Sequence, residues 1–330
     1  MDLARFESFA LEQLAATGLP GLSAAAIHDG EIVWQCGFGF RDLAARRPAT
    51  PRTIYGIASL TKSFTALAVM QLAEQGRLTL DDPVEQHLPA FKLRPGGESV
   101  RLWHLLTHTS GLPALAYSEQ DINAYVLGQP ALPLASVDDL ITFMNDAAGW
   151  VRHRPGEAWY YLNEGYSLLG AIIEQLSGLT YADYVTRHIL EPLGMARSTF
   201  SRATWEADDD AATAYVLTSQ GDRYPGGYTF NPFPAKGGLI SSADEMARYL
   251  AALIRAATGH ETPLARPESV QAMCTPRITR PESGHPFGPL GYGYGLQVLP
   301  DFYGLRVMEH GGSVLTATSH MAGLDLCASL

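Results

Sequence analysis

The sequence has few cysteines, few lysines and no long apolar run. Its 330 residues include three widely spaced cysteines that form no Cys-x-x-Cys pair, namely Cys36, Cys274 and Cys327. This odd number argues against a disulfide framework and against a zinc cluster held by cysteines. Met1–Thr17 carries charges where a signal peptide has its apolar core, and no later run is long enough to span a bilayer. We therefore expect a cytoplasmic protein without a membrane partner.

The chain is acidic, with a formal net charge of −11, and its basic residues form no stripe. It is therefore not expected to bind nucleic acid or an anionic membrane surface. Only three of its 23 basic residues are lysines, namely Lys62, Lys92 and Lys236. A lysine amine can lose its proton on burial, whereas arginine keeps its charge. In a chain that otherwise uses arginine, each lysine is therefore a candidate for a site that needs a deprotonated amine. Nothing in the composition predicts an oligomeric state.

The run Ile57–Leu72 is predicted to be an apolar helix with Ser59 and Lys62 near its start. Residues three apart share a helix face, about 5–6 Å apart at Cβ. A serine at a helix N-terminus lies beside unpaired N–H groups, which favour a developing anion. A desolvated lysine can take the serine proton. The alternative is a helix-capping serine beside a solvated lysine, because Ser-x-x-Lys alone is common by chance.

A second candidate site is Tyr161-Leu162-Asn163. Side chains two apart in an extended chain point to the same side. A phenol can transfer a proton, and an amide can hold a substrate carbonyl. The alternative is that Asn163 caps a helix beginning near Glu164, while Tyr161 is a packed aromatic residue.

A third candidate site is His310-Gly311-Gly312-Ser313, which follows an apolar strand. Paired glycines allow a ligand to approach the backbone closely, and the N–H of Ser313 can donate to an oxyanion. The alternative is a simple turn after the strand.

Two other patterns are weaker. Lys236-Gly237-Gly238 imitates a Lys-x-Gly motif but lies beside a helix cap and follows no strand. His104 and His108 are four apart, as zinc ligands can be, but the glutamate of His-Glu-x-x-His is missing. We expect His108 to hold its own turn together.

The coarse pattern predicts an α/β (α+β) fold. Helical spacing over Leu3–Leu14 is followed by a hairpin at Asp29-Gly30, and capping signatures at Ser136 and Ser242 begin later helices. We interpret 199–234 as loop, 258–291 as a surface excursion, and 292–299 and 305–309 as strands. The prediction is an antiparallel sheet domain, residues 1–77 and 235–330, with a mostly helical domain, residues 78–234, inserted.

In this order and with these flanks, the three sites resemble the serine β-lactamase and penicillin-binding protein superfamily. The similarity is greatest to the class C-like branch, which includes D-aminopeptidases, DD-carboxypeptidases and esterases and has Tyr-x-Asn as its middle motif. Flanking segments contribute to the resemblance, including 80–84, 105–112 and 237–243. The resemblance implies a β-lactamase/transpeptidase-like fold, with helices flanking the sheet.

The resemblance also implies a role for each site residue. Ser59 would be the acylated nucleophile, and Lys62 and Tyr161 would share the general-base and general-acid roles. The N–H groups of Ser59 and Ser313 would form the oxyanion hole. Substrate would be bound by Asn163, His310, Gly312 and Ser313.

The implied activity is that of a serine hydrolase without a metal or cofactor, working through an acyl-enzyme. Its partner would be a small molecule or short peptide, either an ester, a D-amino-acid peptide or amide, or a β-lactam. The alternative is an impaired binding or penicillin-sensing protein.

One departure from the family lies at the C-terminus. Family members continue after Ser313 through further strands and a helix, whereas this sequence stops at Leu330. We expect the C-terminal strands and helix to be truncated, with one partial strand remaining. Apolar residues of the N-terminal helix or hairpin are then expected to be exposed on one side, and activity becomes uncertain.

Overall fold

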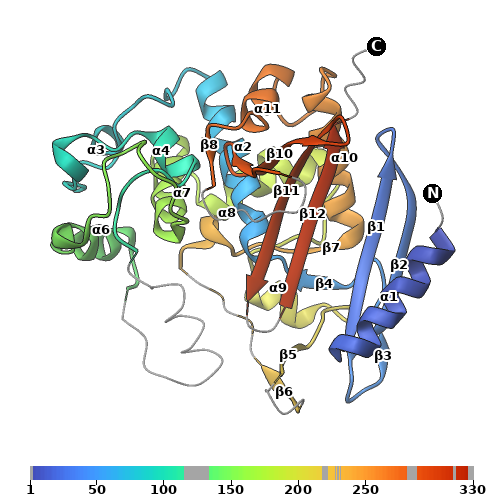
Figure 1. The fold of residues 1–330 in the computed structure, drawn as a ribbon. Helices are drawn as coiled ribbons and strands as arrows, with labels where there is room; N and C mark the ends of the chain where they lie inside the picture. Colours follow the sequence, from blue (N-terminus) through green and yellow to red (C-terminus); the bar gives the residue numbers. More distant parts are fainter. Residues whose placement is uncertain are drawn as a thin grey trace.

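The computed structural model describes residues 3–114, 134–217, 222–226, 228, 230, 232–280, 288–314 and 317–325. It has the predicted mixed α/β architecture, with antiparallel sheets flanked by helices (Figure 1). Its main helices are α1 (Leu3–Thr17), α2 (Thr61–Glu74), α3 (Val84–His87), α4 (Leu102–Leu106), α6 (Val137–Asp146), α7 (Asn163–Ser177), α8 (Tyr181–Val185), α9 (Arg202–Ala207), α10 (Ala243–Ala257) and α11 (Pro267–Met273).

Within the described residues, the strands form four antiparallel sheets. Their bounds are β1 (Gly21–His28), β2 (Glu31–Asp42), β3 (Arg47–Pro48), β4 (Ile54–Gly56), β5 (Ala214–Leu217), β6 (Arg223–Gly226), β7 (Ile240–Ser242), β8 (Ile278–Thr279), β9 (Gly291–Tyr292), β10 (Gln297–Phe302), β11 (Leu305–Val314) and β12 (Ala317–Asp325). The largest sheet has the order β12-β11-β10-β9-β8, and the N-terminal sheet has the order β1-β2-β3. The partial strand expected after Ser313 is therefore present as β12.

The N-terminal sheet begins with the predicted hairpin. Asp29 and Gly30 both have positive φ, at 51° and 78°, which is the conformation that a tight two-residue hairpin turn requires. Helix α1 packs against β2, where the Phe6 ring meets the Trp34 ring edge-on at 5.2 Å. The Trp34 indole N–H donates to the Glu7 carboxylate at 3.0 Å. These contacts hold α1 across the hairpin.

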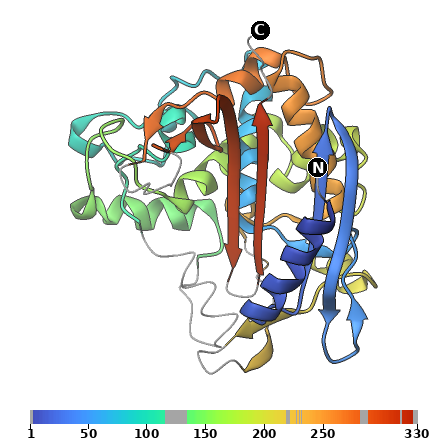
Figure 2. The same cartoon turned by 45° about the vertical axis from the view of Figure 1, so that its right-hand side comes forward.

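Large apolar side chains on this part of the fold are exposed, as expected. Six of them, each at least 37% exposed, are Phe6, Phe9, Leu11, Leu19, Leu22 and Val33. Helix α10 contacts β1, β2 and β12, so one helix packs against both sheets. Figure 2 shows α1 on the outer side of the hairpin, away from α10. Exposed apolar surface of this kind promotes association.

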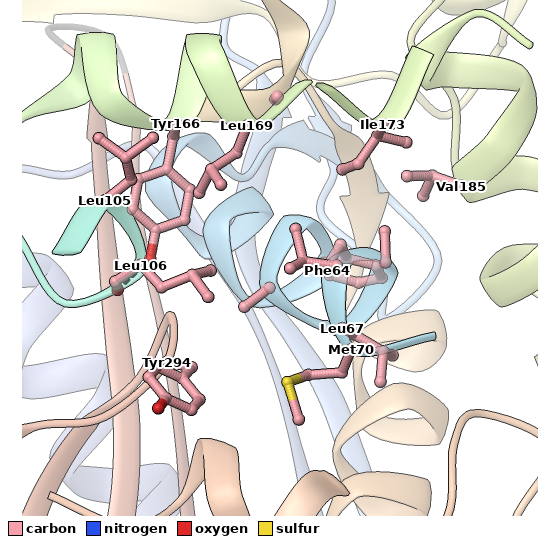
Figure 3. Packing of buried hydrophobic residues seen from close by; sticks show 14 of the residues in the cluster. Phe64, Leu67, Met70, Leu105, Leu106, Tyr166, Leu169, Ile173, Val185 and Tyr294 are labelled. Atoms are coloured by element: carbon pink, nitrogen blue, oxygen red, sulfur yellow. Dashed lines mark hydrogen bonds between the residues drawn. The ribbon is translucent and has the colours of Figure 1, made fainter. Parts of the chain in front are cut away.

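The core is organised around α2. Every residue from Thr61 to Leu72 is buried, which is the pattern of a helix surrounded by protein on all sides. Phe64 stacks on Tyr249 of α10 with ring centroids 3.9 Å apart. Side chains of α7, including Leu169, approach α2 from another side (Figure 3). Neighbouring elements thus fix the position and rotation of α2.

The middle of the chain combines predicted and unpredicted elements. Helix α6 begins as expected, because the Ser136 hydroxyl accepts from the Asp139 N–H at 3.1 Å. The interpretation of 199–234 as loop is wrong in part, since α9, β5 and β6 lie there. Trp205 of α9 packs near Tyr228 and Phe230, so aromatic contacts stabilise this short helix. Likewise α11 and β8 occupy part of 258–291.

The predicted division into two domains stays a prediction. One hydrophobic core includes residues of both segments, such as Leu67, Leu105 and Leu253. In the described part of the chain, no helix combines the length and apolar character needed to cross a bilayer.

His104 of α4 is expected to make the stability of the folded protein sensitive to acid. Its Nδ1 accepts the Arg101 N–H at 2.9 Å, and burial, with the Arg101 charge, lowers the pKa of His104 to about 4. An unfolded histidine has a pKa of about 6.5, so the unfolded chain binds the extra proton between these values. Stability should therefore fall as the pH drops from about 6.5 to about 4.

His104→Asn keeps an acceptor for the Arg101 N–H but cannot titrate. Urea unfolding at several pH values between 7 and 4 should show a shallower loss of stability for this variant than for the wild type. Parallel curves for the two proteins would contradict the assignment.

Candidate active site

Ser59 lies in the 3₁₀ turn η1 (Ala58–Leu60) directly before α2. Its neighbour Ala58 is buried and has φ of +49°, a strained value for a residue other than glycine. The Ala58 carbonyl accepts from the Thr61 hydroxyl at 2.7 Å, and the Ile57 N–H donates to the Leu239 carbonyl at 3.0 Å. Backbone strain held in place by surrounding bonds is typical of functional sites.

The Ser59 hydroxyl is within hydrogen-bond distance of two groups that can exchange its proton. Lys62 Nζ is 3.0 Å from Ser59 Oγ, and the Tyr161 hydroxyl donates to the same oxygen at 2.8 Å. The Ser-x-x-Lys spacing therefore brings the two side chains together as predicted, although a 3₁₀ turn precedes the helix.

Lys62 is fully buried, and its amine contacts two further oxygens. It donates to Asn163 Oδ1 at 2.8 Å and to the Lys236 carbonyl at 2.5 Å. Burial lowers the pKa of Lys62 well below its usual value; the positive charge of Lys236 lowers it further, and Glu164 partly opposes this. Burial and the like charge of Lys236 both favour the neutral amine.

The contacts of Lys62 would allow a neutral amine to act as a base. It has two N–H donors and one lone pair, and the Asn163 and Lys236 oxygens can only accept. If these oxygens take both N–H groups, the lone pair remains for the Ser59 hydroxyl proton. Ser59 can then accept from Tyr161 while it donates to Lys62.

The Tyr161–Asn163 segment presents two side chains to this cluster. Leu162 is extended, with φ of −136° and ψ of 108°, so Tyr161 and Asn163 lie on the same side as predicted. Leu162 occupies the N-cap position of α7 without a side-chain capping hydrogen bond, and Asn163 is the first residue of the helix. Its amide contacts Lys62 instead, which favours the site interpretation over the capping alternative.

The third segment is part of a strand and not a turn. Strand β11 continues through Ser313, with Gly311 opposite His320 and Gly312 opposite Ser319 in β12. It also contacts η1, which carries Ser59. Gly312 is buried and Ser313 is exposed.

His310 is placed differently from the expected substrate-facing position. Its side chain is buried, with Nε2 3.0 Å from the Tyr292 hydroxyl and Nδ1 2.6 Å from the Gly311 carbonyl. Because protein groups contact both ring nitrogens, this packing does not favour the imidazole as a direct substrate ligand. Substrate binding by His310 stays a prediction.

Sequence reasoning missed Lys236 and misplaced His108. Lys236 was interpreted as an imitation of a motif, yet its backbone carbonyl accepts from Lys62 and its charge acts on that amine. The scarcity of lysine could have signalled the charge, whereas no sequence signal marks a backbone carbonyl. His108 was expected to hold its own turn, but its Nδ1 accepts the Leu162 N–H at 3.0 Å, from the segment after Tyr161. That expectation is wrong.

The contacts of His108 do not fit a zinc site shared with His104. His108 Nδ1 and Nε2 contact the Leu162 N–H and the Tyr292 hydroxyl. Within the residues that the structure describes, no three His, Cys, Asp or Glu side chains are arranged to hold a metal ion.

Known proteins are similar to this chain in sequence and in structure. It is 35% identical over 195 residues to Protein flp of Staphylococcus aureus (strain MW2), a match that covers 58% of this chain but only 37% of that protein. Among solved structures, the octameric penicillin-binding protein homologue from Pyrococcus abyssi is 43% identical, with a TM-score of 0.92, over 98% of this chain and 71% of that chain. A D-stereospecific amidohydrolase from Streptomyces sp. is 25% identical, with a TM-score of 0.74, over 96% of this chain and 89% of that chain.

The family model described as Beta-lactamase matches residues 6–327. That range contains Ser59, Lys62, Tyr161 and the β11 segment, and the fold agrees with the solved relatives. The chain therefore belongs to the Beta-lactamase family.

Proposed function

We propose that this protein hydrolyses small esters or D-amino-acid amides and peptides through an acyl-enzyme on Ser59, without a metal or cofactor. The observation that carries the proposal is the contact of the Ser59 hydroxyl with both Lys62 and Tyr161, at 3.0 and 2.8 Å. A serine is nucleophilic only when such a base is adjacent.

In the acylation step, neutral Lys62 accepts the Ser59 proton as Oγ bonds to the substrate carbonyl carbon. The resulting oxyanion is stabilised by the N–H groups of Ser59 and Ser313. Collapse of the tetrahedral intermediate breaks the bond to the leaving group, which receives a proton from Tyr161. Lys62 returns its proton to Tyr161, so the protons balance over the step.

In the deacylation step, water attacks the acyl carbon and gives its proton to the same base. Asn163, whose Oδ1 already holds Lys62 at 2.8 Å, also orients the substrate through its amide N–H₂ group. The backbone of Gly312 and Ser313 at the edge of β11 forms the opposite wall. The acid product leaves, and Ser59 regains its proton.

Mass spectrometry tests this function directly. The purified protein is incubated separately with a fluorophosphonate, a p-nitrophenyl ester and a penicillin, and the modified peptide is mapped over time. A fluorophosphonate adduct on Ser59, with an ester-derived adduct that clears, supports the hydrolase. A permanent penicillin adduct without ester turnover would instead indicate a penicillin-sensing protein. No adduct on Ser59 with any probe would overturn the proposal.

The site predicts a preference for simple esters or D-amino-acid amides over β-lactams. At position 310 the chain has a buried histidine with both nitrogens in contact with protein groups, whereas the Lys-Thr-Gly motif of class A β-lactamases and penicillin-binding proteins has a lysine, whose charge can hold a substrate carboxylate. We expect kcat/KM for p-nitrophenyl butyrate or D-alanine p-nitroanilide to exceed that for nitrocefin by at least about tenfold, or about 1.4 kcal/mol. Faster turnover of nitrocefin than of every simple ester would contradict this prediction.

A further inference from the structure

Two buried groups beside the site have no part in the chemistry described above. His108, in the turn after α4, and Tyr292, at the end of β9, are both at most 1% exposed. His108 Nε2 is 3.2 Å from the Tyr292 hydroxyl, and that hydroxyl is 3.0 Å from His310 Nε2. The three side chains come from three separate segments and form one continuous line of contacts.

Backbone groups fix both ends of this line. At one end the Leu162 N–H donates to His108 Nδ1 at 3.0 Å. At the other end the Gly311 carbonyl, which can only accept, lies 2.6 Å from His310 Nδ1. His108 must therefore leave Nδ1 unprotonated, and His310 must protonate its own Nδ1.

With both histidines neutral, one arrangement of protons satisfies these four contacts. His108 carries its proton on Nε2 and donates to Tyr292, and Tyr292 donates to His310 Nε2. The Tyr166 hydroxyl also interacts with the Tyr292 hydroxyl, but it donates its own proton to the Leu106 carbonyl at 2.7 Å and is therefore not the donor to His310. Four hydrogen bonds thus run in one direction, from Leu162 to Gly311.

The surroundings keep His108 neutral. Its ring packs against the rings of Tyr161 and Tyr166, with centroids 4.3 and 5.1 Å away. Burial lowers the pKa of His108 well below its usual value; the charge of Arg280 acts in the same direction, and the Leu162 hydrogen bond opposes both. An imidazolium would also lose the bond from the Leu162 N–H.

The two ends of this hydrogen-bond chain lie in the two walls of the proposed site. Leu162 is the residue between Tyr161 and Asn163, and Gly311 precedes the Gly312–Ser313 backbone at the edge of β11. We propose that His108, Tyr292 and His310 are positioning residues, whose hydrogen-bond chain holds the Tyr161–Asn163 segment in register with the β11 edge. This inference rests on the proposed function, because it concerns the precision of that site.

The hydrogen-bond chain predicts the tautomers of two histidines in the wild-type protein. In ¹⁵N-histidine-labelled protein at pH 7, two-bond ¹H–¹⁵N spectra should show His108 as the Nε2–H tautomer and His310 as the less common Nδ1–H tautomer. Specific assignment follows from loss of each signal in His108→Asn and His310→Asn. A tautomeric mixture, or an imidazolium, at His108 or His310 would overturn the proposal.

Tyr292→Phe keeps the ring and removes only the hydroxyl that joins the two histidines. Misplacement of catalytic groups by about 1 Å can cost about 10²-fold in rate. We expect kcat for a p-nitrophenyl ester to fall by about 10- to 100-fold while KM changes less than about threefold. The His310 tautomer should also lose its preference. Unchanged kcat with unchanged tautomers would contradict the proposal.

Tyr181→Phe is the matched control. Tyr181 is also buried, and its hydroxyl has a single side-chain partner, Thr65, at 2.7 Å. Removing this hydroxyl should lower the melting temperature to a similar degree but leave kcat and both tautomers unchanged. If Tyr181→Phe lowers kcat as much as Tyr292→Phe does, the effect is general destabilisation and the proposal fails.

Two substitutions at His108 separate its two bonds. Asn places an acceptor where Nδ1 lies and retains the bond from Leu162, whereas Gln reaches the position of Nε2 and retains the contact with Tyr292. His108 has φ of +59°, which asparagine tolerates well. If the hydrogen-bond chain positions the site, each variant should lose kcat by about tenfold or more, because the loss of either hydrogen bond uncouples the two walls. Full activity in either one would contradict the proposal.

Fluorophosphonate labelling distinguishes this inference from the proposed function. If wild-type Ser59 is never labelled, the proposed function fails irrespective of the chain. If wild-type Ser59 is labelled and Tyr292→Phe reacts at the same rate with the same ester kinetics, only the positioning role fails.

Discussion

Ser59→Ala and Lys62→Met are each expected to lower kcat/KM for a p-nitrophenyl ester by at least about 10³-fold. The reason is that nucleophile and base act as one unit, so the loss of either removes the acyl-enzyme route. The double variant should be no worse than about the worse single variant, since little remains to be lost. Lys62→Arg should be as inactive as Lys62→Met, because a guanidinium keeps its proton and cannot accept another.

Lys92→Met is the control for replacing a lysine. Lys92 is exposed, and its amine donates to the Pro89 carbonyl, away from Ser59. Its activity should match the wild type. If Ser59→Ala retained more than about a tenth of the activity while a chelator abolished it, a metal-dependent reaction would replace the proposed one.

The predictable parts of the fold depend on contacts between residues close in sequence. The Asp29-Gly30 hairpin and the Ser136–Asp139 cap each involve residues at most a few positions apart, and both were predicted. The Ser59–Lys62 contact belongs to the same class, because the two residues are three positions apart across the junction of η1 and α2. Such short-range contacts form whenever the helix or hairpin itself forms, whatever packs around it.

The unpredicted parts depend on contacts between distant residues. Lys62 meets the Lys236 carbonyl 174 positions away, and His108 meets Tyr292 184 positions away. No spacing rule connects residues so far apart in the chain. Helix α9 was missed for the same reason, since the packing of Trp205 with Tyr228 and Phe230, across loops of the chain, stabilises it.

The environment of Lys62 leads to a second large effect, on the pH dependence of the reaction. Lys62 must be neutral to accept the Ser59 proton, so kcat/KM should rise as the pH passes through its pKa. The positive charge of Lys236 lowers that pKa, and the negative charge of Glu164 raises it. The two neighbours therefore act in opposite directions on the same amine.

Lys236→Met should move the acidic limb of the kcat/KM profile to higher pH. The substitution removes the positive charge, so Lys62 keeps its proton to a higher pH and activity is lost on the acidic side. The Lys236 carbonyl, which accepts from Lys62, belongs to the backbone and is retained. Activity should therefore recover at alkaline pH. Each tenfold loss at a fixed acidic pH corresponds to about 1.36 kcal/mol of coupling between the two amines.

Glu164→Gln should move the same limb in the opposite direction, to lower pH, because it removes the charge that favours the protonated amine. Lys236→Arg keeps the positive charge and should leave the limb near its wild-type position, and Lys92→Met should not move it. These four profiles test the sign of each charge separately. A shift in the same direction for Lys236→Met and Glu164→Gln would show that the limb does not report Lys62, and would require another group as the base.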